Sequence, residues 1–182
     1  YSDIIDFMNR LKGDVINKRQ LEKLIQSGSF ESVYKNAYPI LEEFNLKPIV
    51  FPIVYYIGKK NIWDYNFSLN KSLHLNKNHL LELNNNGWEI GSHGFFHYPY
   101  TKMNTSEIKS DLKYSKMYLE DLLGNEVVSF SIPFNLYSPF LFKLINEVGY
   151  KNIYFNSFFR SQYYPKQYNI IQRKQIFKTS SI

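Results

Sequence analysis

Apolar residues along this chain follow two patterns, a helical period in some stretches and short continuous runs in others. The helical period, together with capping residues and terminating glycines, predicts helices over four stretches. These are Phe30–Phe44, Asn76–Gly87, Asn104–Gly124 and Ser138–Gly149. In the third, Asn104 and Glu107 have the spacing of a capping box, and the buried face is expected to carry Ile108, Leu112, Ser115, Leu119 and Leu122.

Short apolar runs between the helices indicate buried strands. They cover Ile49–Ile57, Trp88–Gly91, Val127–Ser131, Ile153–Phe155 and Ile170–Phe177. Strands that alternate with helices through short connections predict right-handed crossovers and a largely parallel sheet, either layered or closed into a barrel. In both arrangements functional groups gather at the carboxyl ends of the strands. No repeat or linker interrupts the pattern, so residues 1–182 are interpreted as a single domain.

Composition supports one domain with a sizeable core, since 44% of the 182 residues are hydrophobic. The 16 tyrosines and 15 phenylalanines could also line a groove with rings, as in sugar-binding sites, although a biased genomic composition explains them at least as well. The net charge of +6 comes from 18 lysines and only 4 arginines, scattered along the chain. Because nucleic-acid readers depend on arginine for bidentate contacts, no nucleic-acid partner is expected.

The chain has no cysteine, which excludes a disulfide framework and a thiolate metal site. No run approaches the roughly 20 apolar residues that span a bilayer, so no transmembrane segment is expected. Because the chain begins at Tyr1 rather than methionine, we expect a trimmed form from which any signal peptide or anchor has gone. The compartment stays open, with a bacterial cell envelope slightly favoured over the cytoplasm.

The strongest chemical signal is His93-Gly-Phe-Phe-His97, which directly follows the predicted strand at Trp88–Gly91. A separation of four places two imidazoles on the same side of a helical turn, within reach of one metal ion. Neutral imidazole is the commonest protein ligand for zinc and related ions, so a metal-dependent hydrolase is the first hypothesis. Spacing alone leaves a second interpretation open, namely two surface histidines on a loop. The segment Pro133–Tyr137 follows the next strand and is expected at the same edge of the sheet.

The context of the histidine pair is more specific than the pair itself. The chain has Gly87-Trp-Glu-Ile-Gly-Ser-His-Gly-Phe-Phe-His97, then a helix with Glu107-Ile108, Asp111-Leu112, Ser115-Lys116 and Leu119-Glu120 that ends at Leu123-Gly124, then Phe130-Ser-Ile-Pro-Phe-Asn135. In this order the segments resemble the second motif, the following helix and the third motif of the polysaccharide deacetylase family (carbohydrate esterase family 4, the nodulation-type deacetylase homology domain). The resemblance runs from about Ser29 to Tyr150.

The resemblance implies a distorted (β/α) barrel that uses a divalent metal, with zinc expected, to remove N- or O-acetyl groups from a polysaccharide substrate. It implies that His93 and His97 hold the metal together with one aspartate, and that a second carboxylate is the general base. It also implies that the backbone N–H of Phe134 stabilises the oxyanion of the tetrahedral intermediate. Tyr98 and Tyr137 are candidates for the wall that faces the sugar.

The family's first motif, Thr-Phe-Asp-Asp-Gly, is absent, although it supplies both the base and the third ligand. The corresponding segment reads Leu24-Ile-Gln-Ser-Gly-Ser-Phe-Glu31 and contains no aspartate, so the base is not found in the chain. Either the protein is a catalytically degenerate carbohydrate-binding or scaffold domain, or residues are omitted from the printed sequence between Leu24 and Phe30. The helical pattern of Lys18–Gln26 passes directly into the next helix, so the first strand of the barrel is missing too. Because a degenerate member would normally keep an apolar strand that its core needs, omission is favoured.

Other departures from the family pattern are smaller. Ser131 stands where many members carry an arginine, Asn135 replaces the usual glycine, and no late Leu-His motif is present. Asp64 could approach the metal, but a solvated loop aspartate is the favoured interpretation.

Overall fold

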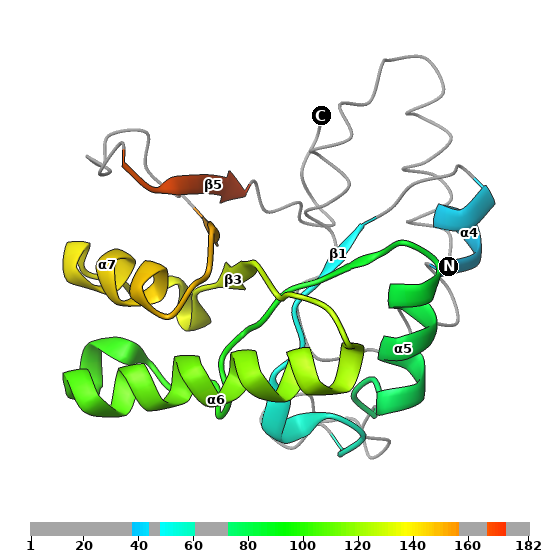
Figure 1. Ribbon diagram of the computed structural model, residues 1–182, viewed down its shortest axis with the longest axis horizontal. Coiled ribbons are helices and arrows are strands. Elements are labelled where there is room, and N and C mark those ends of the chain that lie inside the picture. The colour runs from blue at the N-terminus through cyan, green and yellow to red at the C-terminus, as the bar shows by residue number, and fades with distance from the viewer. Residues whose placement is uncertain (1–37, 44–47, 61–72, 157–166, 174–182) are drawn as a thin grey trace, which may run out of the picture.

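The computed structural model describes residues 38–43, 48–60, 73–156 and 167–173, which form an α/β fold (Figure 1). Short strands alternate with α-helices and with single turns of 3₁₀ helix, labelled η. The strands are β1 (Ile49–Val50), β2 (Glu89–Ile90), β3 (Ser129–Ser131), β4 (Asn152–Asn156) and β5 (Asn169–Arg173). The α-helices are α4 (Tyr38–Glu43), α5 (Lys77–Asn85), α6 (Thr105–Leu123) and α7 (Pro139–Glu147), and the 3₁₀ turns are η2 (Val54–Tyr56), η3 (Tyr100–Lys102) and η4 (Pro133–Asn135).

Every pair of named strands is parallel, as the alternation of strands and helices predicts. β1 pairs with β2, and β3, β4 and β5 pair in that order. A parallel bridge between Ser92 and Phe130 connects the end of β2 to β3, so the strands follow one another in space in their chain order. The predicted parallel α/β arrangement is therefore confirmed.

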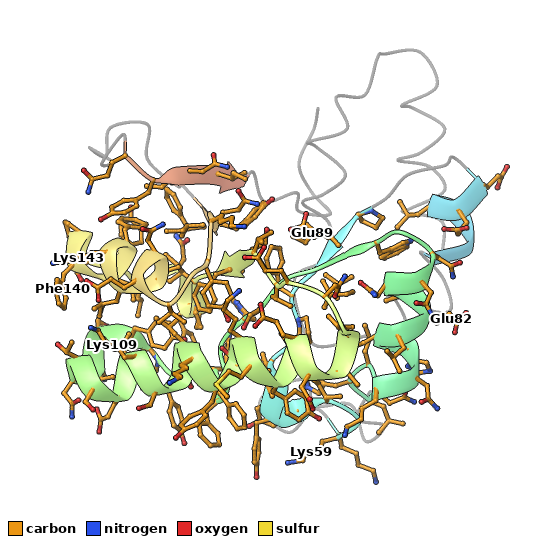
Figure 2. All side chains as sticks on the ribbon, in the orientation of Figure 1. Lys59, Glu82, Glu89, Lys109, Phe140 and Lys143 are labelled. Carbon is orange, nitrogen blue, oxygen red and sulfur yellow. The ribbon has the colours of Figure 1, made fainter. Side chains whose placement is uncertain are left out.

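A series of side-chain hydrogen bonds also crosses from β2 to β5 at the beginnings of the strands. The Ser129 hydroxyl donates to the carboxylate of Glu89, which is labelled in Figure 2. Asn152 Nδ2 donates to Ser129 Oγ at 3.1 Å, and Asn169 Nδ2 donates to Asn152 Oδ1 at 2.7 Å. These bonds connect β2 to the three-stranded sheet through side chains, as the Ser92 bridge does through the backbone.

The strands curl as the wall of a barrel does. The rings of Phe51, which follows β1, and Tyr154, on β4, lie 5.0 Å apart between centroids, although β2 and β3 stand between these strands in the sheet order. Side chains of strands that are not neighbours meet when a sheet closes toward a barrel. Gly91 permits the close approach, because a Cβ there would lie 2.5 Å from the Phe51 ring and 2.8 Å from the Ser129 carbonyl oxygen.

A hydrophobic core lies between the β3–β5 sheet and the helices α6 and α7. Its fully buried members include Leu112 on α6, Phe130 on β3 and Ile145 on α7. Figure 1 shows α6 and α7 side by side, and the two helices contact each other. At their outer surface the Nζ atoms of Lys109 and Lys143, both labelled in Figure 2, lie 2.8 and 3.8 Å from the Glu147 carboxylate. Such exposed pairs contribute little, so burial of the apolar face holds the two helices together.

The predicted inner face of α6 is buried, except that Leu122 is only half-buried. Two charged residues are buried with it, Asp111 and Lys116, which the apolar pattern did not predict. Lys116 Nζ donates to the Glu120 carboxylate and to the Val127 carbonyl, each at 2.7 Å. These bonds replace the water that the ammonium loses on burial, and they tie the end of α6 to the segment leading into β3.

The helix ends follow the predicted capping chemistry in α6 more closely than in α7. The Asn104 side chain accepts from the Glu107 N–H at 3.0 Å, and the Glu107 carboxylate accepts from the Asn104 N–H at 2.8 Å. Gly124 ends α6 in the left-handed conformation, with φ +72°. Ser138 occupies the N-cap position of α7, but its side chain makes no capping hydrogen bond.

The prediction of one strand over Ile49–Ile57 is wrong beyond Val50. The chain leaves the strand after β1 and forms η2 at Val54–Tyr56. Pro52 has no N–H to give to a ladder, and the N–H groups of Val54 and Tyr55 donate instead to the carbonyls of Gly94 and Phe95. The apolar residues of this segment are buried by packing rather than by continued strand pairing.

Several predictions concern residues outside the described ranges and stay predictions. They include the helix Lys18–Gln26, the first part of the helix Phe30–Phe44, the segment Leu24–Glu31 and the position of Asp64. Within the described residues, no helix has the length and apolarity that crossing a bilayer requires.

Asn104→Ala should destabilise the protein by about 1 kcal/mol, because it removes the acceptor that satisfies a free N–H at the start of α6. Ser138→Ala is the matched control, since Ser138 also occupies an N-cap position but makes no capping bond, and it should cost less than about 0.5 kcal/mol. Urea unfolding of both variants measures the difference. Equal losses would show that the capping box contributes nothing beyond N-cap backbone geometry.

Candidate functional site

The carboxyl ends of β2 and β3 lie side by side and carry the two sequence motifs. Ser92 N–H donates to the Ser129 carbonyl at 2.9 Å, and Ser131 N–H donates to the Ser92 carbonyl at 2.8 Å. On the other side, His93 N–H donates to the Pro52 carbonyl at 3.0 Å. The backbone of His93 is thus fixed between the segment after β1 and the end of β3, where Phe134 follows.

The His93 ring has a defined orientation and tautomer. Its side chain is buried, and Nδ1 lies 2.7 Å from the Ser131 carbonyl oxygen. A carbonyl oxygen can only accept, so Nδ1 carries the proton and donates. In the neutral ring the other nitrogen, Nε2, then presents a lone pair, which is the arrangement found in histidine metal ligands.

His97 brings its own Nε2 to within 3.2 Å of His93 Nε2. The ring centroids lie 4.8 Å apart, and the His97 backbone is left-handed, with φ 61°. Burial, with a smaller contribution from the charge of His74, lowers the pKa of His97 to about 4. His97 is therefore neutral at pH 7, the form in which an imidazole can bind a metal.

The geometry of the two nitrogens fits a single ion. Two nitrogens that each bind zinc at about 2.0–2.1 Å with tetrahedral angles lie about 3.3 Å apart, close to the observed 3.2 Å between Nε2 of His93 and Nε2 of His97. The same distance fits one hydrogen bond in which His97 Nε2–H donates to the lone pair of His93. The pair can therefore hold a cation or, without one, a shared proton.

The described residues offer two neutral donors and no third. No cluster of three or more His, Cys, Asp or Glu side chains in the described part of the chain could hold a metal ion. A catalytic zinc site usually has three protein ligands and an open position. The third ligand would therefore have to come from residues outside the described ranges.

The turn after β3 carries backbone strain next to the pair. Phe134 and Asn135 are both left-handed, with φ 54° and 58°. The Phe134 ring lies 4.4 Å from the His97 ring between centroids. Within the described part of the chain, the Phe134 N–H has no hydrogen-bond acceptor, whereas the N–H of Asn135 donates to the Ile132 carbonyl. Phe134 thus has a backbone N–H without an acceptor among the described residues, and its ring packs against His97, which is predicted to be a metal ligand.

His74 is a third histidine near the pair, which sequence reasoning did not connect with it. Its side chain is buried, and its ring stacks on Tyr56 at 5.3 Å between centroids. Its backbone N–H donates to the Lys59 carbonyl at 2.9 Å. No spacing or motif links His74 to His97, so only the folded chain brings its charge close enough to affect the pKa of His97.

The two tyrosines predicted to face the sugar lie in different environments. Tyr98 is 56% exposed and stacks on Phe96, with ring centroids 5.7 Å apart. Both rings line a cavity of about 720 Å³ between the 95–103 segment and α6, which Tyr114 also lines. Tyr137 is half-buried against the rings of Phe142 and Phe155, which leaves only part of its ring to face a substrate.

A comparison with protein families identifies the chain. The family model for polysaccharide deacetylase matches residues 24–153, which is more than half of the sequence. The chain therefore belongs to the polysaccharide deacetylase family. A second family model, for the helix-hairpin-helix motif, matches residues 1–37, which lie outside the described ranges.

Similar proteins share this family and fold. The Bacillus subtilis (strain 168) protein YxkH, provisionally named a polysaccharide deacetylase, is 24% identical over 118 residues, which are 65% of this chain and 38% of YxkH. The structure of IcaB from Ammonifex degensii has a TM-score of 0.67 at 18% identity and covers 84% of this chain and 65% of that chain. The structure of a de-N-acetylase from Aggregatibacter actinomycetemcomitans has a TM-score of 0.72 at 13% identity and covers 98% of this chain and 85% of that chain.

These comparisons confirm the predicted fold, a barrel of the polysaccharide deacetylase type. At such low identity the solved structures show the fold alone. The chain spans about two fifths of the length of YxkH and just under two thirds of the IcaB chain. The roles predicted for His93, His97, Phe134, Tyr98 and Tyr137 stay predictions.

Gly94→Ala should destabilise the protein more than Gly124→Ala does. Both glycines are left-handed, with φ +81° and +72°, so alanine costs about 1–2 kcal/mol of backbone strain at each. At Gly94 the new Cβ would also lie 2.9 Å from Tyr100 Oη and 3.0 Å from Asp111 Oδ2, whereas at Gly124 it would meet nothing within 4 Å. The free energy of unfolding, measured in urea, should fall further for Gly94→Ala by about 1 kcal/mol or more. Equal losses would contradict close packing of this loop.

Proposed function

We propose that this protein is a metal-dependent deacetylase that removes N- or O-acetyl groups from a polysaccharide. The observation that supports it most directly is the 3.2 Å approach of His93 Nε2 and His97 Nε2 at the carboxyl end of β2. The chain belongs to the polysaccharide deacetylase family, and its histidine pair lies beside the turn that follows β3. Zinc is the proposed ion, since neutral imidazole suits it and the donor spacing matches its bond lengths.

In this proposal His93 and His97 hold the ion, and a bound zinc would lower the pKa of a water molecule and polarise the acetyl carbonyl. Ser131 keeps His93 in the tautomer whose Nε2 carries a lone pair, through the 2.7 Å bond from Nδ1–H to its carbonyl. The Phe134 N–H would donate to the oxyanion of the tetrahedral intermediate. An N–H with no acceptor in the described part of the chain is suited to that role.

The third ligand and the general base are not assigned to any residue. The sequence contains no aspartate between Asp14 and Asp64, so the segment matched to the start of the family has none. Two neutral imidazoles bring no negative charge to a divalent cation, and a ring whose Nε2 lone pair binds the metal has no lone pair left to accept the proton of the water. The completeness of this segment therefore decides whether the site can turn over substrate.

The proposed substrate is a polysaccharide, and Tyr98 is the side chain best placed to meet it. Its exposed ring and that of Phe96 are stacked, and both border the cavity of about 720 Å³. Flat exposed rings favour the apolar faces of sugars while leaving hydroxyl groups in water. The 18 lysines, scattered over the sequence, would favour an anionic polymer only in a general way.

The second candidate is a catalytically inactive carbohydrate-binding or scaffold domain on the same fold. The observation that favours it is the absence of an aspartate pair from Leu24–Glu31. In that case the histidine pair would keep its shared proton, and the aromatic rings would bind sugar without hydrolysis. Binding of an acetylated oligosaccharide without release of acetate would distinguish this domain from the enzyme.

His93→Ala and His97→Ala should each abolish zinc binding and acetate release, with little loss of folding, because both rings lie at a strand end rather than in the apolar core. Calorimetric zinc titration and acetate release from acetylated oligosaccharides measure the two effects. His79→Ala is the control, because this half-buried histidine lies on α5, where its Nδ1 accepts from the Asn76 N–H, and it should leave zinc binding unchanged. The same low zinc occupancy in wild type and all three variants would contradict the metal site.

The protein produced from the intact gene should be heavier than the 182 printed residues. The additional mass should map between Leu24 and Phe30 and include an aspartate pair, because the printed sequence has at this place neither the apolar run of a first strand nor the carboxylate of a base. Intact-mass measurement followed by peptide mapping tests this directly. Recovery of the printed sequence without insertion would favour the inactive carbohydrate-binding domain.

A further inference from the structure

A buried carboxylate on α6 holds the loop that carries the histidine pair. Asp111 is only 6% exposed. Its Oδ2 accepts from the Phe95 N–H at 2.9 Å and from the Tyr100 hydroxyl at 2.6 Å, and its Oδ1 accepts from the Phe96 N–H at 3.2 Å. Three donors from one loop thus converge on a single side chain.

The chemistry of these contacts requires an acceptor with two oxygens. An ionised carboxylate only accepts, and it has enough lone pairs for all three donors. An asparagine would keep one oxygen and turn an NH₂ group toward donors that it cannot satisfy. Burial of a charge without a counter-ion is costly, and the described residues place no cation within ion-pair distance of Asp111. The hydrogen bonds to the loop therefore account for keeping a carboxylate here.

The loop is held on its other side by the backbone of η2. Val54 N–H donates to the Gly94 carbonyl at 3.2 Å, and Tyr55 N–H donates to the Phe95 carbonyl at 2.9 Å. Phe95 is thus fixed through both of its backbone polar groups, by Asp111 and by Tyr55. The next anchored residue is Phe96, and His97 follows it directly.

His97 occupies a conformation that its own sequence does not favour. Its φ of 61° lies in the left-handed region, which a residue with a side chain enters only when its surroundings require it. This turn brings His97 Nε2 to 3.2 Å from His93 Nε2. The anchors on Phe95 and Phe96 end one residue before the turn, so they set its starting direction.

We infer that Asp111 is a positioning residue for the histidine pair, which fixes the 95–100 loop so that His97 stays left-handed and its Nε2 meets that of His93. The inference rests on the proposed function for its importance to metal binding, but the convergence of the rings can be tested without a metal. Asp111 acts through the loop and touches neither ring.

The test compares Asp111→Asn with Ser115→Ala and Tyr100→Phe in the full chain. Ser115 is buried one turn further along α6 and bonds to Leu112 and Tyr150 rather than to the loop. Ser115→Ala therefore disturbs the same helix face without touching the Asp111 contacts. Tyr100→Phe removes one of the three donors and keeps the ring.

The first readout is the nuclear Overhauser effect between the ring protons of His93 and His97 without added metal. We expect it in wild type and in Ser115→Ala, weakened in Tyr100→Phe and lost in Asp111→Asn. The second readout is zinc affinity by calorimetry. Asp111→Asn should weaken binding by about 10- to 100-fold, the range typical of residues that orient metal ligands, and Ser115→Ala should leave it within about twofold.

The outcomes separate this inference from the proposed function. An unchanged ring-to-ring effect in Asp111→Asn, or equal losses in Asp111→Asn and Ser115→Ala, overturns the inference. If wild type shows converged rings but binds no zinc, the metal site fails while the positioning role stands. If circular dichroism shows that Asp111→Asn does not fold, Tyr100→Phe becomes the deciding variant. An unchanged ring-to-ring effect together with an unchanged zinc affinity in Tyr100→Phe would then overturn the inference.

Discussion

The backbone bridge between Ser92 and β3 is the interaction on which the rest of this structure depends. Ser92 donates to Ser129 and accepts from Ser131, which joins a two-stranded and a three-stranded sheet into one parallel series. Ser131 then uses its carbonyl to accept from His93 Nδ1. One residue of β3 therefore fixes the position of β2 and the orientation of the first imidazole together. Ser131 makes both contacts through its backbone, so the support of His93 does not depend on which side chain stands at position 131.

The strain of the molecule is concentrated where chemistry is proposed. Among the described residues, those other than glycine with positive φ are His97, which belongs to the pair, Phe134, whose ring packs against His97, and Asn135, which follows Phe134. Each left-handed residue costs about 1–2 kcal/mol, and such costs persist only where the surrounding structure imposes them. Here the sheet fixes one turn, and the contacts of Asp111 and η2 fix the loop before the other. The stability of the barrel is in this way used to hold two rings and one backbone N–H in a prearranged geometry.

Much of the described fold could be predicted because it depends on local chemistry. The capping box at Asn104 and the left-handed Gly124 bound α6 where sequence reasoning placed its ends. Burial of the α6 face also follows from its period. The prediction fails at Ile49–Ile57, where apolar content is high but pairing ends at Val50, because an apolar run indicates burial and not which partner accepts its N–H groups. It also misses Asp111, since a buried carboxylate contradicts the apolar pattern and is explained only by its three donors.

For the site, the sequence by itself determined which residues are available: two histidines four apart after a strand, a Phe-Asn turn after the next, and no aspartate pair before them. Tertiary structure decided that His93 and His97 converge, which nitrogen of His93 carries the lone pair, and that His74 lies close enough to lower the pKa of His97. The physical reason is that helix capping and hydrophobic periodicity depend on residues only a few positions apart in the chain. The distance between two side chains, by contrast, is set by sheet curvature and by hydrogen bonds between segments far apart in the chain.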